Sequence, residues 1–182
     1  NLLMIHPANI DAYRHQTGLF SDLVTHGLHE IDLWLGDIIK AARDASIFEQ
    51  TDFFIVSDHG QLNITRKSAP NAEFRRRKLI ETDHQGRISS YQAFCKSMGM
   101  SAQVFMKPSF SPEEYHEVHA ALKEMCDSGL FGISRVYTKE EARAEEKLAG
   151  DFSFVIETDG STAFINDWNG PAIRAFLHEN LC

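Results

Sequence analysis

The pattern of apolar and polar positions predicts strands and helices along the first sixty residues. Residues 1–5 are mostly apolar and stop at a His-Pro pair, which predicts a short strand, because proline lacks the N–H that a strand needs. Residues 21–45 repeat apolar positions every three or four residues, which predicts an amphipathic helix. Residues 51–57 contain four consecutive apolar residues, typical of a strand buried on both faces of a parallel sheet. We therefore expect a strand-helix-strand unit with a right-handed crossover.

The rest of the chain predicts a second series of elements. Ser111-Pro112-Glu113-Glu114 is a capping box that begins a helix ending at Gly129, and Asp159-Gly160 is typical of a hairpin turn. The other expected elements are a helix over 71–81, an extended segment over 88–94, strands over 102–106, 133–137, 152–157 and 162–165, and a helix over 138–148. The order from residue 101 predicts a compact α+β unit.

Candidate chemistry follows the apolar run at 51–57, where the chain reads Ser57-Asp58-His59-Gly60. Ligands of open α/β sheets bind beyond the carboxyl ends of the strands, so this carboxylate and imidazole are candidate site residues. An Asp-His pair is alternatively a turn residue beside a surface imidazole.

A second pair strengthens the prediction of a site. Asp11 and His15 are four residues apart, and Gly18 follows three residues later. Across one helical turn or in a folded loop, that spacing lets the two side chains converge on one ion; the alternative is a capped turn with a solvated histidine. Two Asp/His pairs without thiolates suit zinc or manganese used for hydrolysis better than a structural cysteine site.

These two motifs together resemble the type I phosphodiesterase/nucleotide pyrophosphatase branch of the alkaline phosphatase superfamily. The resemblance lies in Asp-x-x-x-His-x-x-Gly, an amphipathic helix, and an apolar segment ending in Ser-Asp-His-Gly. It implies that Asp11 and His15 bind one of two divalent ions, zinc or alternatively manganese, and that Asp58 and His59 bind the other.

The chain also departs from the pattern of that family. The resemblance implies a Thr or Ser nucleophile upstream of the first motif and a further His after the second. We therefore expect the chain to be a fragment, with its nucleophile upstream of residue 1 and no turnover alone; if it turns over alone, Thr17, Thr25 and Ser57 are the hydroxyls to consider. His178 is a candidate third ligand, but no Gly follows it.

The resemblance implies an α/β fold, part of a three-layer α/β/α core with a smaller α+β cap inserted. The expected division is a partial catalytic core over 1–99, the cap over 100–168, and a return segment over 169–182. The expected function is metal-dependent hydrolysis of a small phosphodiester or nucleotide. The alternatives are a phosphonate hydrolase or phosphomutase of the same superfamily, and a noncatalytic metal-binding fragment.

Composition limits the kinds of binding partner and the cellular location that we expect. The net charge of −8 disfavours nonspecific binding to nucleic acid or to an anionic membrane. No apolar run reaches the roughly 20 residues of a membrane span, and the three cysteines lack a disulfide-like or CxxC spacing. We expect reduced thiols and a cytoplasmic location.

Other charged or histidine-rich segments have simpler interpretations. The basic run Arg75–Lys78 could meet a substrate phosphate, but four consecutive residues cannot all face one pocket, so a solvated face is favoured. His116 and His119 are three residues apart, which could admit a metal but is typical of an exposed helix. His26 and His29 are likewise interpreted as solvated helix residues.

Overall fold

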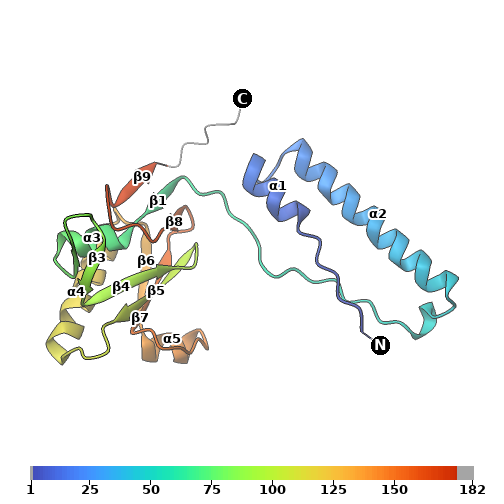
Figure 1. Cartoon of the computed structure of the whole chain (residues 1–182). Coiled ribbons are helices and arrows are strands. Elements are labelled where there is room, and N and C mark those ends of the chain that lie inside the picture. Colours follow the sequence, from blue (N-terminus) through green and yellow to red (C-terminus); the bar gives the residue numbers. More distant parts are fainter. Residues whose placement is uncertain (1, 176–182) are drawn as a thin grey trace. The chain divides into compact units, whose positions relative to one another are not determined.

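The computed structural model describes residues 2–175, which form two compact units; the first ends at Asn63 and the second begins at Ile64. Figure 1 labels helices and strands of both units. Helices and several sheets are present, so the prediction of an α/β protein is confirmed. Within the described residues no helix is both long enough and apolar enough to cross a membrane.

The first unit is built on a pair of helices, α1 (Asn9–Thr17) and α2 (Asp22–Asp44), followed by the short 3-10 helix η1 (Phe48–Gln50). Helix α1 ends at Gly18, whose φ of 86° is readily adopted without a side chain. Helix α2 begins at Ser21, whose hydroxyl accepts a hydrogen bond from the Val24 N–H. The helix predicted over 21–45 is therefore confirmed.

The two strands predicted for this unit are not formed. Residues 2–5 and 51–57 run without strand pairing, and the side chains of Phe54 and Val56 are each 87% exposed. The prediction of a strand-helix-strand unit was wrong for this structure. A strand needs neighbouring strands for its backbone groups and packed layers for its side chains, and the regular elements within residues 2–63 are helices.

The second unit contains a four-stranded antiparallel sheet in the order β4-β5-β7-β6. Its strands are β4 (Ala93–Ser97), β5 (Ser101–Met106), β6 (Ile133–Thr138) and β7 (Phe154–Thr158). The boundary predicted after residue 99 falls inside the β4–β5 connection, because β4 pairs along its whole length with β5. Whether this unit serves as a cap stays a prediction.

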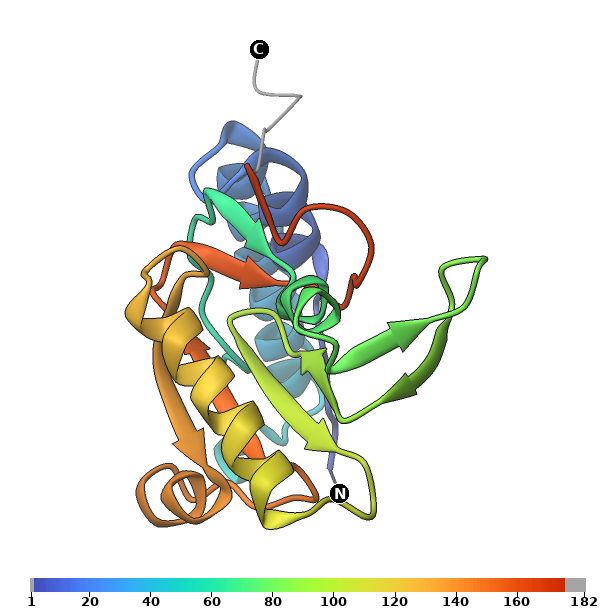
Figure 2. The same cartoon turned by 90° about the vertical axis from the view of Figure 1, so that its left-hand side faces the viewer.

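Two helices pack on opposite faces of this sheet, and Figure 2 shows α4 lying across the front of the strands. On one face α4 (Pro112–Asp127) packs Val118, Leu122 and Met125 against the strands. On the other face α5 (Lys139–Glu145) packs near Tyr137 and Val155. Each helix begins with a capping box in which both reciprocal hydrogen bonds are formed, at Ser111 and at Thr138. The predicted starts of both helices are therefore confirmed.

A second sheet in this unit joins segments that are far apart in the sequence. It places β1 (Arg66–Ser68) between β8 (Thr162–Phe164), which is parallel to it, and β9 (Ile173–Ala175), which is antiparallel. The predicted β7–β8 hairpin was wrong, because the chain turns at Asp159-Gly160 and then leaves the β7 sheet to pair with β1. Arg66 stabilises this turn by donating to Asp159 Oδ2 at 2.5 Å and to Thr162 Oγ1 at 2.7 Å.

The remaining elements form an arm and its base. Helix α3 (Pro70–Arg76) is shorter than predicted, and β2 (Ile80–Thr82) pairs with β3 (Ile88–Tyr91) as a hairpin that projects from the unit (Figure 2). Lys78 has a φ of 63°, which ends the helix before β2. The Asp83–Gly86 turn is formed as predicted, with the Gly86 N–H donating to the Asp83 carbonyl at 2.9 Å.

Candidate metal centre

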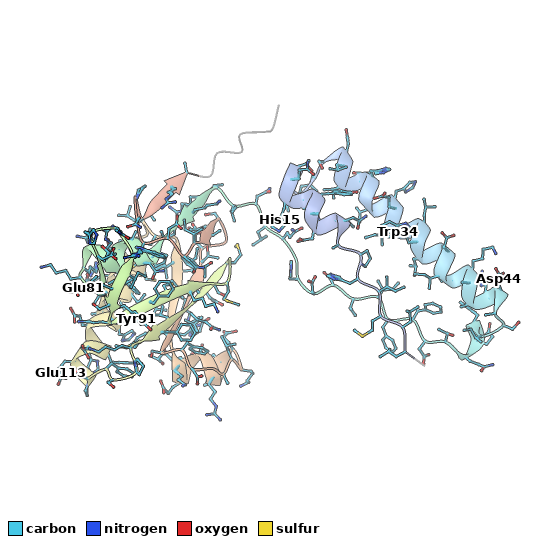
Figure 3. The ribbon with its side chains drawn as sticks, in the orientation of Figure 1. His15, Trp34, Asp44, Glu81, Tyr91 and Glu113 are labelled. Atoms are coloured by element: carbon cyan, nitrogen blue, oxygen red, sulfur yellow. The ribbon has the colours of Figure 1, made fainter. Side chains whose placement is uncertain are left out.

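The first motif lies on α1. Asp11 and His15 are one turn apart, and the distance from Asp11 Oδ1 to His15 Nε2 is 3.4 Å. Both side chains are open to solvent, with exposed fractions of 52% and 74%, and Figure 3 labels His15 on this helix. The helix therefore aims a carboxylate oxygen and an imidazole nitrogen at the same point.

The second motif is held by hydrogen bonds within its own turn. The Ser57 hydroxyl donates to the His59 carbonyl at 2.7 Å, and the His59 N–H donates to Asp58 Oδ1 at 3.0 Å. The other carboxylate oxygen, Oδ2, lies 3.5 Å from His59 Nε2. These contacts form without a preceding strand.

The histidine of this motif has a defined proton arrangement. His59 Nδ1 lies 2.9 Å from the Gly60 carbonyl, which can only accept, so Nδ1 carries the hydrogen. In the neutral ring Nε2 is then the free nitrogen, and this is how metal-binding histidines are commonly oriented by a backbone carbonyl. The same Gly60 carbonyl, followed by the Asp58 carboxylate, raises the pKa of His59 above its ordinary value.

Gln61 connects the two motifs. Its Nε2 donates to Asp11 Oδ1 at 2.9 Å, and its Oε1 accepts from Arg14 Nη1 at 3.5 Å. The Asp11 carboxylate also contributes to the raised pKa of His59. Through Gln61 the structure therefore brings Asp11 near the Asp58-His59 turn.

In each motif, the distance between the two ligand atoms suits binding to one divalent ion. Zinc bonds of about 2.0–2.1 Å in tetrahedral geometry place two ligand atoms about 3.3 Å apart, close to the separation within each motif. Within residues 2–175, no three His, Cys, Asp or Glu side chains are arranged to hold one ion. Each motif thus offers two ligands, and their role in metal binding stays a prediction.

Comparison with known families now identifies the chain. The family model described as type I phosphodiesterase / nucleotide pyrophosphatase matches residues 1–177. The chain belongs to this family. The resemblance proposed from Asp11, His15 and Asp58-His59 is therefore confirmed, and the chain falls in a family of phosphoric ester hydrolases. Searches of curated proteins and of solved structures gave no match.

In this phosphodiesterase family member, the three hydroxyls considered above as nucleophiles are bonded to backbone carbonyls. Thr17 Oγ1 donates to the Tyr13 carbonyl at 2.8 Å, and Thr25 Oγ1 donates to the Ser21 carbonyl at 3.2 Å. Ser57 bonds within its own turn, as described above. Thr25 and Ser57 are therefore held by their own helix or turn, and Thr17 Oγ1 also lies 2.6 Å from the Ser21 hydroxyl.

The basic run of this family member serves the fold of the second unit. Arg76 and Arg77 both donate to the buried carboxylate of Glu73, and Arg75 donates to Asn169 Oδ1 at 2.7 Å. Arg77 also donates to Glu124 Oε2 at 2.6 Å, so these three arginines are engaged in contacts within the second unit. Whether the run meets a substrate phosphate is not decided by these contacts.

The two histidines on α4 lie in different environments. The His119 ring stacks on Phe154 with 5.3 Å between ring centroids, whereas His116 is exposed. Burial against that sheet lowers the pKa of His119. His178, the other candidate ligand, lies outside the described residues.

Proposed function

We propose that this chain carries the metal-binding part of a phosphodiesterase or nucleotide pyrophosphatase. Asp11 and His15 would hold one divalent ion, and Asp58 and His59 would hold the other. The observation that supports this most strongly is the anchored Asp58-His59 turn, whose imidazole keeps Nε2 free beside a carboxylate oxygen 3.5 Å away. The equivalent separation of 3.4 Å in the first motif gives independent support.

The chemistry of the four side chains favours zinc, with manganese as the alternative. When bound, such ions polarise a phosphate and favour ionisation of an attacking hydroxyl. The two aspartates supply negative charge. The two histidines bind as neutral imidazoles, so a protonated ring must first lose the proton on the nitrogen that binds the ion. By family resemblance, the nucleophile and a further histidine come from segments outside these two motifs.

The substrate class proposed here is a small phosphodiester or a nucleotide with a pyrophosphate bond. A phosphonate hydrolase or a phosphomutase is the alternative, because the same metal motifs occur across that superfamily. A noncatalytic metal-binding fragment is the remaining alternative. Hydrolysis rates distinguish a phosphodiesterase from a phosphonate hydrolase and from a binding fragment. A phosphodiesterase cleaves bis(4-nitrophenyl) phosphate faster than a phosphonate, and a binding fragment cleaves neither.

The decisive variant is Asp58→Asn, made in a polypeptide that carries both motifs and hydrolyses a phosphodiester. Loss of an anionic ligand should lower metal-dependent hydrolysis of bis(4-nitrophenyl) phosphate by roughly a hundredfold or more. His116→Ala is the matched control and should retain activity, because His116 is an exposed residue of α4. Equal activity of Asp58→Asn and wild type at limiting zinc or manganese would contradict the proposal.

A further inference from the structure

Gln61 contacts the first motif although it follows the second in the chain. Its Nε2 donates to Asp11 Oδ1, across 50 residues of sequence, at 2.9 Å. The oxygen of the same amide accepts from Arg14, which lies three residues after Asp11 on α1. A guanidinium can only donate and a carboxylate can only accept, so the two partners fix which end of the amide faces Asp11.

The Asp11 carboxylate needs such a contact. It is 52% exposed on the surface of a helix, so packing does not select its rotamer. Its neighbour His15 comes from the same helix and moves with it. The Gln61 amide, in contrast, comes from the irregular segment after η1 and can fix the carboxylate relative to the second motif.

The backbone carries this contact to the second motif. Gln61 directly follows Gly60, and the Gly60 carbonyl accepts from His59 Nδ1 at 2.9 Å. One short stretch therefore orients the His59 ring at one end and the Asp11 carboxylate at the other. In a segment without strand pairing, these bonds take over the positioning that a sheet would provide.

We propose that Gln61 is a positioning residue that aligns Asp11 with the Asp58-His59 turn, so that the two ion sites form together. This inference rests on the proposed function, because it assigns Gln61 a role toward the same ions. Residues that orient a metal ligand typically contribute about 10- to 100-fold to metal affinity.

The test is a cobalt(II) titration of the full chain, followed by the visible absorption of the bound ion. Gln61→Met has nearly the volume of glutamine but cannot donate, so it should weaken cobalt binding by about 10- to 100-fold and change the absorption band. Gln61→Ala should give the same loss, which guards against an effect of the added apolar side chain. Gln85→Met, in the exposed turn of the β2–β3 arm, is the control and should bind as wild type does.

A double variant separates positioning from a general loss of structure. If Gln61 acts through Asp11, then Gln61→Met added to Asp11→Asn should weaken cobalt binding little further. Additive losses in the double variant would contradict the role of Gln61. So would wild-type cobalt affinity in Gln61→Met when Asp11→Asn is impaired. Either result would leave the proposed metal sites in place. If Asp11→Asn and Asp58→Asn also bind cobalt as wild type does, the metal sites of the proposed function fall with it. Circular dichroism of every variant checks that the helices are retained.

Discussion

Asn71 is a buried amide whose partners explain why a polar residue lies in the core of the second unit. Its Nδ2 donates to the Cys95 carbonyl, and its Oδ1 accepts from the Cys95 N–H, both at 2.7 Å. The side chain therefore occupies the place of a neighbouring strand at the outer edge of β4. An edge satisfied in this way is also less available for pairing with another chain.

Removing that amide should be costly, because two buried backbone groups lose their partner. We expect Asn71→Ala to lower the free energy of unfolding by about 2 to 4 kcal/mol. Urea unfolding followed by circular dichroism measures this, with exposed Gln85→Ala as the control. A loss as small as that of the control would show that water replaces the amide.

Glu73 predicts a pH dependence with a defined sign. The side-chain hydrogen bonds from Arg76, and after them those from Arg77, lower the pKa of Glu73 below its ordinary value of 4.5. A carboxyl with a lowered pKa stabilises the fold above its unfolded pKa, and that stabilisation is lost as the pH falls through the folded value. The stability difference between wild type and Glu73→Gln should therefore be largest above pH 4.5 and shrink below it. Urea unfolding across this range measures the difference, and a difference that does not change with pH would contradict the ion-pair account.

At the scale of elements, the contact between α1 and α2 depends on one glycine. A Cβ at Gly27 would lie 2.7 Å from Tyr13 Cδ2, so the two helices approach closely only because this side chain is absent. Tyr13 and Asn9 on α1 also donate to Glu30 of α2, at 3.4 and 3.1 Å. This contact sets the position of the helix that carries Asp11 and His15.

Two glycine substitutions in α2 should have opposite effects. Gly27→Ala should lower stability by about 1 to 3 kcal/mol, because Tyr13 must move. Gly36→Ala should raise it by up to about 1 kcal/mol, since nothing lies within 4 Å of its added methyl group and alanine favours a helix. Chemical unfolding of both variants gives the comparison. A stabilising Gly27→Ala would mean that the helices do not pack as described.

Elements with local determinants could be predicted from the sequence. Ser111 and Thr138 begin their helices because each capping box lies within four consecutive residues. Local sequence signals of this kind could not show that residues 51–57 would not form a strand, or that β7 and β8 would not pair as a hairpin. Strand pairing depends on partners elsewhere in the chain, and here Arg66 binds Asp159 and Thr162 from 93 and 96 residues away.

At the scale of the whole molecule, the same distinction applies to the candidate metal centre. The pairs Asp11/His15 and Asp58-His59 could be singled out from their spacing, because the two side chains of each pair are close in sequence. Gln61 was missed, since its contact with Asp11 crosses 50 residues and an amide after a glycine carries no spacing signal. Family membership, with the match over residues 1–177, is what connects both motifs to phosphoric ester hydrolysis.

The central claim is that these four residues bind divalent ions, and anomalous X-ray diffraction at the zinc edge tests it most directly. Crystals of the chain grown with zinc should show one peak at bonding distance, about 2.0–2.2 Å, from Asp11 and His15 and a second at that distance from Asp58 and His59. Asp58→Asn crystals grown in the same zinc concentration should lose or weaken the second peak. Zinc bound at His116 and His119, with no peak beside Asp11 or Asp58, would contradict the account.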